Sequence, residues 1–473
     1  MVAICDLLFV HARVPVRYYS YLRRYTYLYE PGTSLSHDSN YIMAPLVGLA
    51  LALLSVGGTP GAGHIGRFRG GGDRITKVKS DEDVMLFPTL SRQVEPSSGS
   101  GGVAEWDVAI HGWIFEPEHT SLRRRAFIKF LRKVLDLDEN EEASEILERR
   151  LRPFLYDNER GKSLTVELLT DQLSGDCSDT DEESSNPVDA RNDVNPKTRK
   201  RMPRSGRDGH FKGTFRISDT DFNSCHAGDT CSLSLRLVQP KQRDGDNDGR
   251  SKPNKKRRRM WKRRVALENR VFTGTTYLLP PVGLSVISDI DDTIKQSCVL
   301  DKKELMRNTF LQEFKPVPGM SQLYQSWSKR GAAFHFVSSS PFQLYRELHA
   351  FLERESFPLG SFHLKQIRAK PSAVLNLLSD PFERKCSTIG SIIDAYPTRT
   401  FVLVGDTGEK DPEVYGEIYR RYPNQIWRVY LRDAGEQSTE RRFDAAFADV
   451  PPDIWTVFQD ASEISLPEES TCR

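Results

Sequence analysis

Four short apolar runs, separated by helical patterns, constrain the fold of the C-terminal half of this chain. The runs are LSVIS from Leu284, AFHFVSSS from Ala333, FVLVG from Phe401 and IWRVYL from Ile426. Intervening segments such as MSQLYQSWSKR and FQLYRELHAFLERE have apolar residues at helical spacing. Continuous apolar strands that alternate with helices are typical of a parallel sheet covered by helices on both faces. We therefore predict an α/β domain over residues 283–448.

Acidic and hydroxyl side chains follow three of these runs where each predicted strand ends. SDIDDT comes after the first run, SSSP after the second and GDTGEKD after the third. The carboxyl ends of parallel strands share one edge of the sheet, and ligands bind in the crevice there. We therefore expect four carboxylates to converge at this edge, those of Asp289, Asp291, Asp406 and Asp411. Because unpaired carboxylates are costly to bury, the cluster predicts a cation, and Mg²⁺ fits since it takes hard oxygen ligands.

Three further side chains are candidates for binding a phosphoryl group at this edge. Thr293 supplies a hydroxyl that can steady the turn or hydrogen-bond a carboxylate, and Lys385 can offset the charge of a phosphoryl group. Ser338 can donate a hydrogen bond to phosphate oxygens, with Ser339 and Ser340 as alternatives. The sequence thus combines carboxylates of the metal-binding kind with the cation and donors that phosphoryl transfer needs.

Together these residues resemble the four motifs of the haloacid dehalogenase-like superfamily of phosphohydrolases. The matching residues, in motif order, are Asp289, Asp291 and Thr293 (DxDxT); Ser338; Lys385; and Gly405, Asp406 and Asp411 (GDxxxxD). GDxxxxD alone would be a weak signal, but all four motifs occur in the order of the family. The resemblance implies a haloacid dehalogenase-like, Rossmannoid parallel sheet with helices on both faces.

The resemblance also implies a mechanism. Asp289 would attack phosphorus to form an aspartyl-phosphate, while Asp291 would protonate the leaving alkoxide and then deprotonate the attacking water. Mg²⁺ would be held by Asp289, Asp406 and the backbone carbonyl of Asp291. Asp411 would be either a direct ligand or a residue that supports one. Hydrolysis is favoured because the ion-pumping ATPases of the superfamily carry threonine at the position of Asp291. No chemical step is assigned to Asp292.

A closer resemblance covers roughly Trp106 to Asp433 and is carried by GLSVISDIDDTIK, VSSSP and FVLVGDTGEKDPEVY. These segments resemble the fungal actin-patch-associated Mg²⁺-dependent phosphatidate phosphatases, which pair a β-rich N-terminal region with such a catalytic domain. The resemblance implies hydrolysis of phosphatidate to diacylglycerol and phosphate. It also implies a cytoplasmic protein, attached peripherally to anionic membranes at cortical actin patches, with endocytic or actin-patch proteins as partners.

Two other functions stay open from the residues themselves. The same chemistry can serve a phosphatase that acts on phosphoproteins or soluble phosphate esters. The β-rich domain and its basic loops can instead make an adaptor for membranes or trafficking proteins, in which catalysis is incidental. The charge is almost balanced, with 67 basic and 65 acidic residues, so no nucleic-acid partner is expected.

The preceding part of the chain predicts a β-rich, sandwich-like domain over residues 101–282. Strand-type patterns begin near Trp106, Leu164, Phe211, Cys231 and Val271. Apolar residues at helical spacing between residues 121 and 155 predict a helical insertion, limited by Pro153. Two runs with few apolar residues, 176–209 and 241–264, predict disordered charged loops.

The two ends of the chain carry weaker signals. Residues 1–100 predict a flexible or targeting region, because glycine, serine and proline dominate from Gly57 to Gly102, and 449–473 predict a short tail. The apolar stretch 41–58 has three interpretations: a membrane anchor, a targeting segment, or an extension outside the folded protein. Seven scattered cysteines without metal-type spacing favour reduced thiols and a cytosolic setting.

The basic run KPNKKRRRMWKRR, from Lys252 to Arg264, has three interpretations as well. It can attract anionic lipids, serve as a nuclear-localisation-like address, or be a solvated loop between two strands. A second basic cluster from Lys197 favours the membrane surface, since the implied substrate is an acidic lipid.

Overall fold

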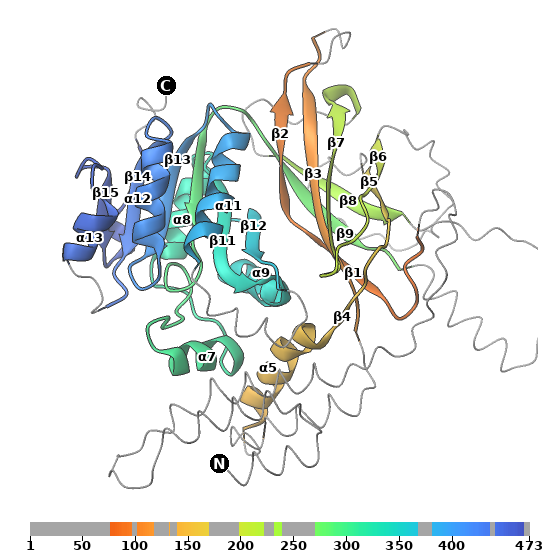
Figure 1. Ribbon diagram of the computed structural model, residues 1–473, viewed down its shortest axis with the longest axis horizontal. Helices are drawn as coiled ribbons and strands as arrows, with labels where there is room; N and C mark the ends of the chain where they lie inside the picture. Colours follow the sequence, from red (N-terminus) through yellow and green to blue (C-terminus); the bar gives the residue numbers. More distant parts are fainter. Residues whose placement is uncertain are drawn as a thin grey trace, which may run out of the picture.

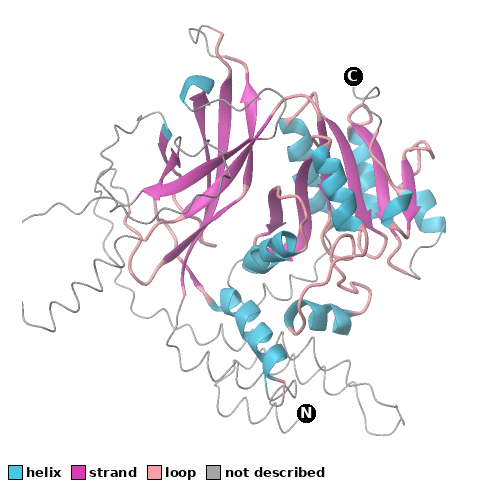
Figure 2. Ribbon diagram, turned by 180° about the vertical axis from the view of Figure 1, so that it is seen from behind, coloured by secondary structure: helices cyan, strands magenta, loops and turns pink. Residues whose placement is uncertain are grey.

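The computed structural model describes residues 76–96, 102–117, 132, 140–169, 198–221, 231–238, 270–367, 381–435 and 440–467. They form two sheets that lie side by side, a largely antiparallel one from the N-terminal half and a parallel one from the C-terminal half (Figure 1). Figure 2 shows from behind that the helices gather around the parallel sheet, with α5 below the antiparallel one.

The parallel sheet has the strand order β12-β11-β10-β13-β14-β15, and every neighbouring pair in it is parallel. Its strands are β10 (Leu284–Ser288), β11 (Ala333–Pro341), β12 (Ser361–Lys365), β13 (Thr400–Asp406), β14 (Ile426–Arg432) and β15 (Trp455–Phe458). The chain starts in the middle of the sheet, proceeds to one edge and then to the other, which is the doubly wound order. The predicted α/β class with a parallel sheet is confirmed.

Helices cover both faces of this sheet (Figure 1). They are α7 (Lys302–Phe310), α8 (Met320–Lys329), α9 (Tyr345–Arg354), α11 (Phe382–Ala395), α12 (Asp411–Arg421) and α13 (Glu440–Ala446). Successive strand residues point to opposite faces. Val286 and Val404 thus pack with α8 and α9, whereas Ile287 and Leu403 pack with α11 and α12. Burial on both faces explains why the strands are continuous apolar runs.

The antiparallel sheet joins nine strands in the order β1-β3-β2-β9-β8-β5-β6, with β4 and β7 also paired to β3. Its strands are β1 (Asp83–Phe87), β2 (Thr89–Val94), β3 (Glu105–Glu116), β4 (Asp157–Asn158), β5 (Thr165–Leu169), β6 (Arg199–Arg201), β7 (His210–Ser218), β8 (Cys231–Val238) and β9 (Thr273–Leu279). All five strands expected from the sequence are present, as β3, β5, β7, β8 and β9.

Strands β1 and β2 correct the prediction of a flexible region through residue 100. They run along one edge of β3, separated by Pro88, and Val84 and Leu86 are buried. Proline cannot donate a ladder hydrogen bond, so it interrupts the strand. That interruption, together with the glycine-rich and serine-rich sequence nearby, conceals the strand pattern.

Strand β6 corrects the end of the disordered loop predicted for residues 176–209. Arg199 forms an ion pair with Glu167 of β5 at 2.8 Å, and Met202 is buried in the core of the sheet. A charged run is stable as a strand here because its charges meet opposite charges on the neighbouring strand. Residues 176–197 lie outside the described part of the chain.

Strand β15 corrects the prediction of a short tail from residue 449. It pairs in parallel with β14, and Phe458 is buried, so the sheet includes part of this segment. The strand has only four residues and follows two prolines, which is why the sequence suggests a loop.

Other predicted segments fall wholly or mostly outside the described residues, among them the apolar stretch 41–58, the charged loop 241–264 and most of the helical insertion. The end of that insertion is described as α5 (Glu141–Leu151), followed by the 3-10 turn η2 (Arg152–Leu155) that contains Pro153. Among the helices that the structure describes, none is both long and apolar enough to cross a membrane.

One cluster of buried apolar side chains contains residues from both parts of the molecule. Phe87 of β1 contacts Phe342 and Tyr345 of the parallel part, with ring centroids 4.5 and 5.0 Å apart. Leu147 of α5 belongs to the same cluster of buried side chains. The antiparallel part is therefore packed against the domain that carries the predicted site.

Candidate active site

The predicted site residues lie at the carboxyl edge of three adjacent strands. Asp289 follows the last residue of β10, Ser338 lies near the end of β11, and Asp406 is the last residue of β13. Asp411 begins α12, and Lys385 lies in the first turn of α11. The edge is beside β10, where the order of strand connections reverses, and such a position is where doubly wound sheets bind ligands.

Three of the carboxylates form a buried group. One oxygen each from Asp289, Asp406 and Asp411 lies within 4.8 Å of the others, and the three residues are at most 2% exposed. The Oδ2 atoms of Asp289 and Asp406 accept no hydrogen bond from any described residue. Buried carboxylate oxygens without donors, in a set of hard oxygen ligands, fit a divalent cation such as Mg²⁺.

Electrostatics support the same conclusion. Burial raises the pKa of Asp289 well above its ordinary value, and the positive charge of Lys385 offsets this only in part. Burial also raises the pKa of Asp406, and the negative charges of Asp411 and Glu409 raise it further. The protein alone therefore does not stabilise all of these carboxylates in their ionised form, whereas a divalent cation would.

Lys385 is the cation within this group. Its Nζ lies 3.0 Å from Asp289, 2.5 Å from Asp411 and 3.4 Å from Glu409, and the side chain is 1% exposed. Burial by itself would lower the pKa of Lys385, but the negative charges of Asp289, Asp411 and Glu409 outweigh that effect and raise the pKa well above its ordinary value. Lys385 is thus fixed in its charged form beside the predicted nucleophile.

The carboxylate of Asp291 is not part of the three-carboxylate group and is held by four donors. Lys295 Nζ and Ser297 Oγ each lie 2.8 Å from Oδ1, while Ser338 and Ser340 donate to Oδ2 at 3.1 and 2.9 Å. Burial would raise the pKa of Asp291, but the charge and hydrogen bond of Lys295 lower it to about 2. Asp291 therefore has a fixed side-chain orientation and is separate from the three-carboxylate group. Of this residue, only the backbone carbonyl is left as a predicted metal ligand.

The two remaining polar residues of the DIDDT string lie close by. Asp292 accepts hydrogen bonds from the backbone N–H groups of Ser297, Cys298 and Val299 at 2.7, 2.9 and 2.6 Å. It therefore anchors the loop after the strand, which agrees with its lack of a chemical step. Thr293 is fully buried, and its hydroxyl makes no hydrogen bond to the described residues.

Several residues of the site are not predicted from the sequence. Glu409 adds a carboxylate, with its Oε2 atom 3.3 Å from the Ser339 hydroxyl as well as near Lys385. Arg384 donates to the backbone carbonyl of Ser338 at 2.9 Å, and Lys295 holds Asp291. Glu409 and Lys295 lie within the quoted motifs GDTGEKD and DIDDTIK, so their positions in the strand-end loops are the signal that could have identified them.

Comparisons with known proteins agree with this geometry. Residues 284–433 match the protein-family model described as "Phosphatidate phosphatase APP1, catalytic domain", and every site residue named above lies within that range. Residues 284–433 are therefore similar to the catalytic domain of that family. The chain also matches two curated fungal proteins.

The first relative is Phosphatidate phosphatase APP1 of Saccharomyces cerevisiae, which is 33% identical over 156 residues, covering 32% of this chain and 26% of the yeast protein. The second is an uncharacterized protein of Schizosaccharomyces pombe, 31% identical over 155 residues, covering 32% of this chain and 25% of that protein. The matches thus span about a quarter of the length of these relatives.

Replacing Asp406 with asparagine tests the electrostatics of the carboxylate group. The amide keeps an oxygen for the backbone N–H groups of Gly408 and Glu409 but removes a buried charge. We expect the metal-free variant to unfold at a higher temperature than the metal-free wild type, by a few degrees, since about 1 kcal/mol shifts Tm by about 2–4 °C. Mg²⁺ should raise the Tm of the wild type and not that of the variant.

The gain should depend on pH with a defined sign. Folding raises the pKa of Asp406 above its ordinary value of 3.8, so ionisation of Asp406 destabilises the metal-free wild type. Below pH 3.8 Asp406 is protonated in both the folded and the unfolded wild type, so the variant should be no more stable than the wild type. The stability difference in favour of the variant should grow as the pH rises from there through the folded-state pKa. Thermal unfolding in EDTA across this pH range measures the difference, and a variant that is less stable at neutral pH would contradict the assignment.

Proposed function

We propose that this chain is a Mg²⁺-dependent phosphatidate phosphatase, which hydrolyses phosphatidate to diacylglycerol and phosphate through an aspartyl-phosphate. The observation that carries the proposal is the convergence of Asp289, Asp291, Lys385 and Asp406 within a domain similar to the APP1 catalytic domain. A reactive carboxylate, a separate proton-transferring carboxylate and a fixed cation are the groups that such a reaction requires.

The proposed reaction has two steps, and the positions of these side chains support it. Asp289 attacks phosphorus through one carboxylate oxygen, while Lys385 neutralises negative charge beside its Oδ1 atom. Lys295 keeps Asp291 ionised in the free protein, so Asp291 must first take up a proton before it can deliver one to the leaving diacylglycerol oxygen. In the second step it takes a proton from the water that cleaves the aspartyl-phosphate. We assign phosphate binding to the hydroxyls of Ser338 and Thr293, and the absence of a hydrogen-bond partner for the Thr293 hydroxyl among the described residues supports its part.

The metal would be held by Asp289 and Asp406, with Asp411 and the backbone carbonyl of Asp291 as the remaining predicted ligands. When bound, Mg²⁺ supplies positive charge that stabilises the transferring phosphoryl group. The unpaired oxygens of Asp289 and Asp406 support this ligand set.

The finer fold class is part of the proposal. We assign the parallel domain to the haloacid dehalogenase-like folds, supported by its doubly wound strand order and by the placement of the four motifs. We assign the antiparallel part to the sandwich-like folds, because its strands enclose an apolar core of their own, which includes Val108, Val166 and Leu235.

The cellular setting is also inferred. Phosphatidate stays in the bilayer, so the enzyme would act while attached peripherally to an anionic membrane surface, from the cytoplasmic side. The basic run 252–264 supports such attachment, since each basic residue near an anionic surface contributes about 1 kcal/mol. Recruitment to cortical actin patches by endocytic partners follows from the family resemblance alone.

Phosphate release by the purified protein tests the proposal. Phosphatidate would be presented in mixed micelles, with Mg²⁺ or with EDTA, beside a phosphoserine peptide and a soluble phosphomonoester. We expect Mg²⁺-dependent turnover of phosphatidate well above that of both controls. Turnover of the controls but not of the lipid would keep the chemistry and reject the lipid substrate, and no turnover of any of the three would favour the adaptor function.

A further inference from the structure

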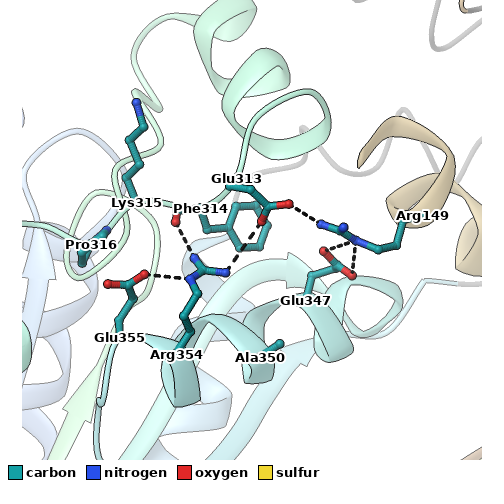
Figure 3. A pocket seen from close by; sticks show the side chains of 9 residues that line it. All are labelled: Arg149, Glu313, Phe314, Lys315, Pro316, Glu347, Ala350, Arg354 and Glu355. Carbon is teal, nitrogen blue, oxygen red and sulfur yellow. Dashed lines mark hydrogen bonds and ion pairs between the residues drawn. The ribbon is translucent and has the colours of Figure 1, made fainter. Parts of the chain in front are cut away.

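Helix α5 joins the antiparallel part of the molecule to the catalytic domain through two adjacent arginines. Arg149 lies at the surface and pairs with Glu313 at 2.6 Å and with Glu347 at 3.0 Å. Figure 3 shows these contacts at the edge of an open pocket of about 710 Å³. Arg150, the next residue, is 1% exposed and points into the junction.

Arg150 fixes the end of α7 and the segment after it. Its guanidinium donates to the backbone carbonyls of Thr309 at 2.8 Å and Gln312 at 2.6 Å, near the C-terminus of the helix, where carbonyls lack partners within the helix. The same guanidinium lies 3.7 Å from the centre of the Phe314 ring. A buried arginine from α5 thus determines where this segment lies.

The segment from Phe314 to Val317 pairs in turn with the loop of the predicted nucleophile. Gln296 donates its backbone N–H to the carbonyl of Lys315, and Val317 donates to the carbonyl of Ile294, both at 2.9 Å. Between these two hydrogen bonds lies Lys295, which forms an antiparallel bridge with Pro316. The backbone position of Lys295 therefore depends on this segment.

The side chain of Lys295 completes the connection. Its Nζ lies 4.7 Å from the centre of the same Phe314 ring and 2.8 Å from Asp291 Oδ1, and the residue is 1% exposed. A cation over an aromatic face is attracted to the ring, and more strongly when it is removed from water. Phe314 and Lys295 thus link Arg150 to Asp291.

We propose that Arg150 of α5 is a positioning residue for catalysis, which holds Phe314 and Lys295 so that the Asp291 carboxylate is oriented for proton transfer. The inference rests on the proposed function in assigning that step to Asp291. It gives the N-terminal half of the chain a role in the reaction itself, since α5 precedes the catalytic domain in the sequence.

The expected loss of kcat follows from the geometry that proton transfer requires. A displacement of about 1 Å in a catalytic group can cost about 10²-fold in rate. We therefore expect Arg150→Met to lower kcat by about 10²-fold with KM nearly unchanged, because Arg150 touches neither the three-carboxylate group nor its lysine. Arg149→Met is the matched control on the same helix, and it should keep kcat at the wild-type level.

A double-mutant cycle separates positioning from general destabilisation. Arg150→Met would be measured in the wild-type background and in Asp291→Asn, at a temperature where thermal unfolding shows each protein to be folded. If Arg150 acts through Asp291, its substitution should lower kcat in the first background and have no further effect in the second. An equal decrease in both backgrounds, or no decrease in the first, would overturn the proposal.

Phe314→Leu serves if Arg150→Met does not fold, because it keeps an apolar side chain but removes the ring that contacts both cations. The same non-additivity with Asp291→Asn is expected. The wild type would be assayed first on phosphatidate and on a soluble phosphomonoester. If the wild type hydrolyses the soluble phosphomonoester but not phosphatidate, the proposed lipid substrate is rejected. The double-mutant cycle measured on the soluble phosphomonoester then still decides whether Arg150 positions Asp291.

Discussion

Asp289→Asn is expected to abolish phosphate release, with a loss on the order of 10⁴-fold or more, as found when a nucleophile is removed. The amide nitrogen or oxygen cannot form the covalent phosphate ester that the proposed reaction needs. The variant should still fold, because Lys385 keeps its contacts with Asp411 and Glu409 and one buried negative charge is removed.

Two measurements make this prediction specific to covalent catalysis. Steady-state phosphate release gives the loss of rate. The mass of the acid-quenched protein shows whether a phosphoryl group, which adds about 80 Da, is attached to the wild type at about one per chain and is missing from the variant. Asp453→Asn is the matched control, since its side chain is 74% exposed and its ion-pair contact, at 3.9 Å, is with Arg428 rather than with a residue of the site. Residual activity above about 1% of wild type would reject Asp289 as the nucleophile.

The sequence predicts the centre of this site well because the centre is defined by strand ends. Asp289 and Asp406 follow or end apolar runs, and parallel strands bring such positions to one edge whatever the length of chain between them. Lys385 could be placed by its order among the motifs, and the structure puts it between two of the predicted carboxylates.

The surroundings of the site are less predictable, because they depend on contacts between loops. Lys295 faces Asp291 only because its loop pairs with the segment that contains Phe314, and no periodicity in the sequence reports such a pairing. Arg150 is one of two adjacent arginines on α5, of which one is exposed and the other fully buried. Composition alone does not distinguish them.

The errors in the antiparallel sheet have a similar cause. Strands β1 and β2 are split by Pro88, and β6 is a run of three basic residues. Each is stabilised by its neighbour, through ladder hydrogen bonds to β3 or ion pairs to Glu167, rather than by a pattern of its own. In these strands, tertiary contacts override weak local sequence signals.

Lys385→Met is expected to destabilise the metal-free protein by about 3–5 kcal/mol, the usual cost of leaving buried charges without their partner. Since about 1 kcal/mol corresponds to about 2–4 °C for a domain of this size, the Tm should fall by roughly 10 °C. Methionine fills a similar volume, so lost packing contributes little. Mg²⁺ should restore part of the stability, because it compensates the same carboxylates. Activity should fall as well.

A second substitution identifies the source of this loss. Asp411 lies 2.5 Å from Lys385, and Asp411→Asn removes the charge that the lysine compensates most closely. Thermal unfolding of the wild type, both single variants and Lys385→Met/Asp411→Asn, each in EDTA, completes a double-mutant cycle. If carboxylate repulsion is responsible, the double variant should be more stable than Lys385→Met. If it is equally unstable or less stable, the lysine contributes through packing, and the case for a cation-dependent carboxylate group would lose its electrostatic support.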